Sequence, residues 1–154
     1  MRSFSSIYVS GGALILGSDR ELLMVRQRPS VGGIWQGAWI FPGGGIRLGE
    51  RLEEAVHREV REETGLEIEL LRQLWPLERI QPMAGGRCLH VIYLTFLARS
   101  LGEEPFPGDD VGEVRWTALS DLPSVRREIH EDAWLLTEMA GLVPSDGGPR
   151  FMPR

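Results

Sequence analysis

Apolar and polar residues follow one another along the chain in short segments of recognisable period. Two apolar, partly alternating runs at residues 7–16 and 22–28 flank the polar segment 17–20, and this pattern predicts a β-hairpin. Further strand-like runs cover residues 68–77, 88–98 and 114–117, with a turn at 82–86 before the second and an acidic loop at 102–112 before the third. The middle of the chain is therefore expected to be rich in strands.

Two segments have the composition and spacing of helices. Residues 48–64 are helix-forming, and Gly65 follows where a left-handed residue commonly ends a helix. Residues 131–142 place their large apolar side chains at helical spacing, which predicts an amphipathic helix packed on the core. Between the hairpin and the first helix, a short apolar piece at 39–41 leads into Pro42 and three glycines, which we expect to form a sharp, exposed loop.

This succession of elements predicts one domain of the α/β (α+β) class over residues 1–143. No internal repeat and no long linker divides the chain, and hairpins alternating with two main helices favour helices packed on a mixed sheet. Hydrophobic residues make up 42% of the 154 positions and charged residues 25%, as in ordinary globular domains. The segment 144–154 is rich in proline and glycine, and we expect it to be a loose tail.

The overall charge excludes some classes of partner. A net charge of -5 gives no attraction to nucleic acid or to anionic membranes. No apolar run reaches the roughly 18 residues that a membrane span requires, and the first residues lack the apolar core of a signal peptide. We therefore expect a cytoplasmic protein that binds no membrane and no nucleic acid.

The cysteine and lysine contents narrow the possible chemistry. The single cysteine, Cys88, excludes an internal disulfide and a cysteine-based zinc cluster, and its apolar surroundings predict a buried structural thiol. All 17 basic residues are arginines. Without lysine the chain has neither Schiff-base catalysis nor a Walker-type phosphate loop.

Three acids of the first predicted helix indicate a metal site. On a helical wheel with Leu52 at zero, Glu59, Glu62 and Glu63 fall at about 340°, 280° and 20°, next to the apolar face. Carboxylates spaced in this way are neighbours and repel one another unless they are protonated or bridged by a cation. Simple solvation is the alternative, but the position beside the apolar face favours a hard divalent ion such as Mg²⁺ or Mn²⁺.

The segment that contains these acids resembles a known family signature. Its fixed positions are Gly44, five residues, Glu50, seven residues, Arg58-Glu59-Val60, one residue, Glu62-Glu63, one residue, and Gly65-Leu66. This pattern resembles the box of the Nudix hydrolases without a departure, and the likeness continues more loosely over residues 7–123. The resemblance implies an α/β/α sandwich with a mixed sheet and a Mg²⁺-dependent hydrolase of phosphoanhydride bonds.

The same resemblance implies roles for individual residues. Glu59, Glu62 and Glu63 are the expected catalytic acids and, together with Gly44, the expected metal-binding residues for Mg²⁺, with Mn²⁺ as the other candidate ion. One of the three glutamates or a later acid would accept a proton from the attacking water. Glu50 and Arg58 are expected to form a structural charged pair.

A further catalytic acid is expected after the box. Glu113 is the first candidate because it lies where the acidic loop enters a strand. The alternatives are Glu103, Glu104, Asp109 and Asp110, each of which is also an ordinary candidate for solvated surface.

The expected substrate-binding residues lie before and within the box. Arg26 and Arg28 alternate along a strand end and would bind phosphate from one face. Trp35 lies in a glycine-rich loop and would stack on a base. Gly43 and Gly44 complete the set, whereas Trp39 is expected in the core and His90 as a packed or surface residue.

Several functions remain open at this point. The leading hypothesis is hydrolysis of a nucleoside diphosphate linked to another moiety, with ADP-ribose or a nucleotide sugar as the favoured substrate, because the chain looks like small bacterial Nudix enzymes of that type. A nucleoside triphosphate pyrophosphohydrolase of house-cleaning type is the first alternative, and a non-hydrolytic nucleotide-sensing module is the second. An mRNA-processing role is disfavoured by the acidic charge, and the family resemblance implies a homodimer.

Overall fold

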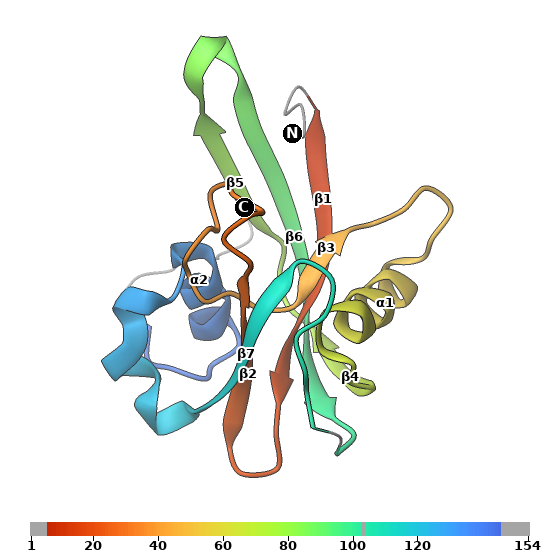
Figure 1. Ribbon diagram of the computed structural model, residues 1–154, viewed down its shortest axis with the longest axis vertical. Coiled ribbons are helices and arrows are strands. Elements are labelled where there is room, and N and C mark those ends of the chain that lie inside the picture. Colours follow the sequence, from red (N-terminus) through yellow and green to blue (C-terminus); the bar gives the residue numbers. More distant parts are fainter. Residues whose placement is uncertain (1–5, 103, 146–154) are drawn as a thin grey trace.

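A mixed β-sheet lies between helices in the computed structural model, which describes residues 6–102 and 104–145 (Figure 1). The predicted α/β/α sandwich is confirmed. The expected loose tail from residue 146 onward lies outside the described residues, and the domain boundary at 143 stays a prediction. The strands are β1 (Ile7–Leu16), β2 (Glu21–Gln27), β3 (Gly43–Gly45), β4 (Ile68–Gln73), β5 (Leu77–Pro82), β6 (Cys88–Ser100) and β7 (Val111–Ala118). The helices are α1 (Leu52–Thr64), α2 (Glu131–Met139) and the 3₁₀ segments η1 (Ala84–Gly86) and η2 (Leu119–Glu128).

The long strand β6 organises the sheet. Its residues 90–99 pair in parallel with the whole length of β1, while β5 and β4 pair antiparallel with the first and last parts of β6 on the opposite edge. On the far side of β1 lie β2 and β7, so the main strand order is β4-β6-β1-β2-β7, with β3 added to β1. The predicted hairpin of β1 and β2 is present, joined at the Leu16–Leu22 pair.

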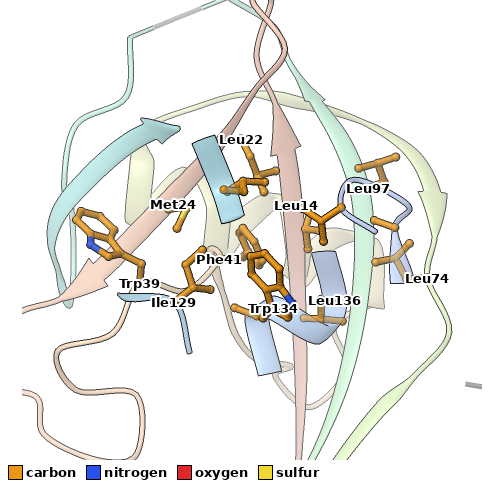
Figure 2. Packing of buried hydrophobic residues seen from close by; sticks show 14 of the residues in the cluster. Leu14, Leu22, Met24, Trp39, Phe41, Leu74, Leu97, Ile129, Trp134 and Leu136 are labelled. Atoms are coloured by element: carbon orange, nitrogen blue, oxygen red, sulfur yellow. The ribbon is translucent and has the colours of Figure 1, made fainter. Parts of the chain in front are cut away.

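Two apolar cores lie on opposite faces of the sheet, and alternation along the strands decides which side chain enters which core. On the α2 side, Leu14, Leu22 and Met24 pack with Trp39 and Trp134, as Figure 2 shows. On the α1 side, the strand residues alternate with these and pack under Val56 and Val60 of the helix. The predicted core position of Trp39 is confirmed, with 3% of its surface exposed.

The glycines after Pro42 differ from expectation. Gly43–Gly45 form strand β3, antiparallel to β1, with Gly43 opposite Gly12 and Gly44 opposite Gly11. The prediction of a sharp, exposed loop was wrong because these glycines are needed for close approach of two backbones. A Cβ on Gly43 would lie 2.8 Å from the Gly11 carbonyl oxygen, which no other residue could avoid.

Other boundaries also differ. The first helix begins at Leu52, after a turn at residues 47–50, and the predicted strand 68–77 is divided into β4 and β5 before Leu77. The segment η2, which contains Pro123, was not predicted. Cys88 is exposed at the start of β6, so the prediction of a buried thiol was also wrong.

No helix among the described residues is long and apolar enough to cross a membrane. The cytoplasmic location stays a prediction.

Candidate active site

The acids of the box lie along one side of α1, which packs on β1. Ala55, Val56, Val60 and Thr64 are buried and fix the inward face of the helix. As their place beside the apolar residues predicted, Glu59 and Glu63 are partly buried at the border of this face, and Glu62 is exposed at its rim. The helix ends at Gly65, whose φ of 72° is the predicted left-handed cap.

Strand β3 brings its backbone against two of these acids. The Gly43 amide donates a hydrogen bond to Glu63 Oε2 at 3.2 Å. A Cβ placed on Gly44 would lie 2.5 Å from Glu59 Oε1, so the Glu59 carboxylate rests directly on the glycine backbone. The predicted site residues Gly43, Gly44, Glu59 and Glu63 are therefore neighbours in space.

Arg58 connects the remaining acids of the box. Its Nε and Nη2 donate to the Glu50 carboxylate at 2.6 and 2.9 Å, which is the expected charged pair. Its Nη1 also donates to Glu59 Oε1 at 2.9 Å and to Glu62 Oε2 at 3.2 Å, and Nη2 reaches the Gly45 carbonyl oxygen. One guanidinium thus holds the turn, the strand and two acids of the helix together, a role that the sequence did not reveal.

The surroundings of the acids shift their proton affinities. Burial raises the pKa of Glu63 well above its ordinary value, and the charge of Glu59 raises it further. Burial also raises the pKa of Glu59, although the hydrogen bond from Arg58 acts in the opposite direction. By contrast, the hydrogen bond from Arg58 lowers the pKa of Glu50 to about 2. The surroundings of Glu59 and Glu63 therefore disfavour their negatively charged forms, and a nearby cation would stabilise those forms.

The chemistry of these donors fits a hard divalent cation, since every one of them is an oxygen. The residues that would hold the ion are Glu59, Glu62 and Glu63, with the Gly44 carbonyl. As they stand, no three carboxylate, imidazole or thiol side chains within residues 6–102 and 104–145 converge to enclose an ion. Glu59 and Glu62 are turned to Arg58 and Glu63 to Gly43, so binding an ion requires Glu59 and Glu62 to exchange bonds with Arg58 for bonds with the metal.

The acidic loop packs against the last turn of α1. The amides of Phe106 and Gly108 donate to the carbonyl oxygens of Thr64 and Glu63 at 3.1 and 3.0 Å, so the loop satisfies carbonyls that the helix end leaves free. A Cβ on Gly108 would lie 2.4 Å from the Glu62 carbonyl oxygen, which shows how close the approach is. The loop is thereby fixed beside the box.

Within this loop, Asp109 lies near the box acids, whereas Glu113 is paired elsewhere. The negative charge of Asp109 contributes to the raised pKa of both Glu59 and Glu63. Asp109 has a left-handed φ of 51° and makes no hydrogen bond or ion pair with the described residues. Glu113, the acid predicted first, forms an ion pair with Arg26 at 2.5 Å. Glu104 lies exposed earlier in the loop, and the predicted alternative Glu103 lies outside the described residues.

The two arginines predicted to bind phosphate already have partners. Arg26 pairs with Glu113 and lies 4.8 Å over the Trp39 ring. Arg28 lies 3.9 Å from Asp110, and its amide donates to the Asp110 carbonyl oxygen at 2.8 Å. The register shift between Arg26 and Gln27 leaves Gly112 of β7 unpaired, and β2 ends at Gln27, one residue before Arg28.

Trp35 belongs to a polar cluster that the sequence did not reveal. Its indole Nε1 donates to Tyr93 Oη at 3.1 Å, and Tyr93 donates to Asp132 Oδ2 at 2.7 Å. Arg79 in turn donates through Nε and Nη2 to the buried Asp132 carboxylate. Burial and the hydrogen bond to Asp132 raise the pKa of Tyr93. Arg79 and Asp132 come from β5 and the start of α2, and no sequence spacing connects them.

The Trp35 cluster, formed by Trp35, Tyr93, Asp132 and Arg79, is connected to the box at residues 44–66 through neighbouring strands of the sheet. Gly45 of β3 lies opposite Ser10 of β1, and Ser10 lies opposite Tyr93 of β6, so the three occupy one cross-strand row. On the same face of the sheet as this row, the ring of Tyr8 lies against Gly45, where a Cβ would meet it at 3.0 Å. His90 lies further along β6 and contacts Glu78 at 2.8 Å, at the surface and away from the box. The box and the Trp35 cluster are therefore joined through the short strand β3.

Comparison with known proteins agrees with this geometry. Residues 8–140 match the family model described as the NUDIX domain. The nucleoside triphosphatase NudI of Escherichia coli is 36% identical over 97 residues, which are 58% of this chain and 68% of that protein. The ADP-ribose pyrophosphatase of Methanocaldococcus jannaschii is 31% identical over 113 residues, which are 72% of this chain and 62% of that protein. The chain therefore matches a little under two thirds of the length of the archaeal relative.

Solved structures show the same fold. The MutT NUDIX hydrolase from Burkholderia pseudomallei superposes with a TM-score of 0.74 at 26% identity, covering 88% of this chain and 98% of that one. The NUDIX domain of Shewanella oneidensis NrtR, solved with ADP ribose, gives a TM-score of 0.69 at 23% identity over 90% of this chain and 88% of that one. With a family match over most of its length and relatives named as hydrolases, the chain belongs to the NUDIX domain family and is a Nudix hydrolase.

Proposed function

We propose that this Nudix hydrolase is a Mg²⁺-dependent pyrophosphohydrolase that cleaves the phosphoanhydride of a nucleoside diphosphate linked to another moiety. The observation that carries the proposal is the contact of the box acids with β3, where Glu63 accepts the Gly43 amide and Glu59 rests on Gly44. Because Gly43–Gly45 carry no side chains, β3 places none of its own between the acids and a phosphate group. ADP-ribose and nucleotide sugars are the favoured substrates.

The chain's own residues support each part of the proposed reaction. Glu59, Glu62 and Glu63 would hold the metal, with Arg58 keeping Glu59 and Glu62 on the same side of α1 until the ion binds. The bound ion would neutralise charge on the diphosphate oxygens and lower the pKa of a water. Glu63, whose burial favours protonation, and Asp109, which has no hydrogen-bonding partner among the described residues, are the candidates for accepting the proton of that water.

The Trp35 cluster supports a substrate with a large group beyond the diphosphate. Trp35 and Tyr93 offer aromatic faces, and Asp132 and Arg79 offer an acceptor and donors. Of these residues, Tyr93 lies in the cross-strand row that starts at Gly45 of β3. A base or ribose bound there would leave the diphosphate at Gly43–Gly45. The similarity to an archaeal ADP-ribose pyrophosphatase supports the same class of substrate.

Nucleoside triphosphates are the second candidate, supported by the similarity to NudI proteins named as nucleoside triphosphatases. A substrate panel with Mg²⁺ separates the two. ADP-ribose or a nucleotide sugar should release a nucleoside monophosphate and a sugar phosphate, whereas a triphosphate should release pyrophosphate. Turnover of triphosphates alone would replace the first candidate with the second, and no turnover of either class would contradict the proposed activity.

The proposed metal ligands have a separate test. Glu59→Gln and Glu62→Gln keep the side-chain volume and remove a ligand charge, so turnover should fall by roughly a hundredfold or more while the melting temperature changes little. Mn²⁺ binding, measured by electron paramagnetic resonance, should weaken in parallel. Glu53→Gln, on the exposed first turn of the same helix, serves as the matched control. Unchanged turnover and Mn²⁺ binding in both variants would refute the assigned site.

A further inference from the structure

The segment that leads into α2 is held against Trp39. Trp39 and Ile129 lie side by side (Figure 2) and form an isolated β-bridge. The Trp39 amide donates to the Glu128 carbonyl oxygen at 2.8 Å, and the His130 amide donates to the Trp39 carbonyl oxygen at 3.0 Å. The backbone of His130 is therefore fixed in place before the helix begins.

His130 caps the N-terminus of α2 through its side chain. The first amides of a helix have no acceptor within the helix, and an N-cap side chain commonly supplies one. Here His130 Nδ1 accepts a hydrogen bond from the Asp132 amide at 3.1 Å. An imidazole nitrogen accepts only when it carries no proton, so this contact requires the neutral ring with its hydrogen on Nε2.

The residue that this cap holds is the acid of the Trp35 cluster. Asp132 is 4% exposed, and its carboxylate accepts hydrogen bonds from Tyr93 and Arg79. The Tyr93 hydroxyl in turn accepts a hydrogen bond from the Trp35 indole. His130 therefore belongs to a continuous set of hydrogen bonds that ends at the Trp35 indole.

A proton on His130 would reverse the direction of its contacts. The imidazolium has two N–H donors and no acceptor, so the Asp132 amide would lose its partner. His130 Nδ1 also lies 3.8 Å from Asp132 Oδ2, which is the oxygen that the Tyr93 hydroxyl binds at 2.7 Å. A charged His130 would therefore attract this oxygen and compete with Tyr93 for it. The effect of one proton would reach the Trp35 indole through Tyr93.

The groups around His130 favour its neutral form. Burial lowers the pKa of His130 below its ordinary value of 6.5, and the negative charge of Asp132 opposes this shift without reversing it. Arg79 of β5 lowers the pKa further, whereas Glu131 of α2 raises it. On β6, burial raises the pKa of Tyr93, so its hydroxyl keeps its proton. His130 is therefore the member of this set whose charge changes just below neutral pH.

We propose that His130 is a positioning residue, whose neutral imidazole holds Asp132 so that the Trp35 cluster can bind its ligand and whose protonation releases Asp132. The identity of the ligand as a base or ribose rests on the proposed function. The coupling between His130 and Trp35 does not depend on any substrate. Binding at the Trp35 cluster should weaken as His130 becomes protonated, which adds a pH dependence that does not originate in the acids of the box.

Nuclear magnetic resonance of the full chain tests the coupling without substrate. The imidazole nitrogen signals of neutral His130 should show the hydrogen on Nε2, and the indole N–H signal of Trp35 should shift as His130 titrates. In His130→Asn an amide oxygen can still cap the helix but takes no proton, so the Trp35 signal should no longer follow this titration. Tyr93→Phe should also remove the dependence, because it removes the hydroxyl between the two residues. His90→Asn is the matched control, since His90 pairs with an exposed acid elsewhere on β6 and should leave the Trp35 titration as in wild type.

Thermal unfolding should detect the same proton. Because the pKa of His130 is lower in the folded chain than in the unfolded chain, the unfolded chain binds more protons between the folded value and pH 6.5. The stability that this group contributes is complete above pH 6.5 and is lost as pH falls through the folded pKa. The melting temperature of wild type should therefore fall relative to that of His130→Asn as pH decreases below 6.5.

Kinetics on the substrate that the panel identifies test the role in binding. The KM of wild type should rise about fivefold as His130 becomes protonated, with a smaller change in kcat, because one cap contact is lost while the box is untouched. His130→Asn should lack this rise, and His130→Ala, which has no cap at any pH, should keep the raised KM throughout.

Two results would overturn the proposal. One is a Trp35 signal that does not respond to the titration of His130, and the other is a KM that rises equally in wild type and His130→Asn. A chain that turns over no substrate would instead contradict the proposed function. The Trp35 signal would then decide by itself whether His130 is coupled to the cluster.

Discussion

Glu59, Glu62 and Glu63 have different sets of neighbours, and these determine how freely each carboxylate can move and hold its charge. Glu59 lies between the Gly44 backbone and Arg58, Glu62 shares the same guanidinium at the rim, and Glu63 is turned to the Gly43 amide. Three residues of one type on one helix are therefore not interchangeable. Substitutions should separate their contributions.

Gly44→Ala should disturb the site without unfolding the protein. The new Cβ would lie 2.5 Å from Glu59 Oε1 and displace that carboxylate, and a misplacement of about 1 Å in a site can cost on the order of a hundredfold in rate. Gly17→Ala is the control, because its Cβ would also be crowded, 2.8 Å from the Glu21 side chain, outside the site. Steady-state kinetics should show lost turnover only for Gly44→Ala, and thermal melting should show that both variants are folded. Equal turnover in both variants would contradict the assignment of Gly44 and Glu59 to the site.

Glu63 should make the metal-free protein less stable as pH rises. Burial raises its pKa in the folded state, so between pH 4.5 and that raised value the folded chain binds more protons than the unfolded chain. Stability from this group is complete below pH 4.5 and is lost as pH rises through the folded pKa. Glu63→Gln in EDTA should therefore melt above wild type at neutral pH, with the difference shrinking toward pH 4.5. A difference that does not vary with pH would argue against this account.

At the scale of elements, the contact between the acidic loop and α1 positions Asp109, the candidate acid that follows the box. Backbone amides of the loop bind the last carbonyls of the helix, and the Phe106 ring lies against Gly65, where a Cβ would meet it at 2.5 Å. The loop and the helix end therefore form one unit. Loosening this contact should move Asp109 away from the box.

Gly65→Ala should cost more stability than its backbone angle alone explains. A left-handed conformation costs an alanine roughly 1–2 kcal/mol, and the collision with Phe106 adds to this. Gly85→Ala is a matched control, since Gly85 has a φ of 73° and nothing within 4 Å of its Cβ position. Urea denaturation should show the larger loss for Gly65→Ala, and Phe106→Ala should remove the excess. Equal losses at the two glycines would show that the ring contact contributes nothing.

What the sequence predicted and what it missed follow from the range of the interactions. The helix of the box, its Gly65 cap and the Glu50–Arg58 pair depend on residues close in the chain, and their spacing reveals them. Asp132 and Arg79 are 53 residues apart and meet only because α2 packs beside β5, so no local pattern announces their contact. Consecutive glycines are compatible with a loop and with a strand, and Gly43–Gly45 form a strand because they pair with β1.

At the scale of the whole molecule, the sheet separates two kinds of chemistry. The acids lie on the α1 side, while the Trp35 cluster lies with Asp132 on the side covered by α2. Strand β3 is short and borders β1 alone, so a ligand beside it could reach both sides. This arrangement allows substrate recognition to change without changing the metal site.

Trp35→Ala should test this separation. If the Trp35 cluster binds a base or ribose, the variant should raise KM for the true substrate, with a smaller change in kcat, because the acids are untouched. Trp75→Ala is the control, since Trp75 is 59% exposed between β4 and β5. Unchanged KM for Trp35→Ala would remove this cluster from the proposed binding site.

The three glycines of β3 also limit how this protein can vary over time. Gly43 is confined by the β1 backbone, Gly44 by a proposed metal ligand and Gly45 by the ring of Tyr8. Only the last constraint belongs to a side chain outside the proposed catalytic set, so only at Gly45 can a second change, to a smaller residue at position 8, restore what the first removes. In proteins descended from this sequence, Gly45 can therefore be replaced if residue 8 changes as well. No second substitution can compensate in the same way for a replacement of Gly43 or Gly44.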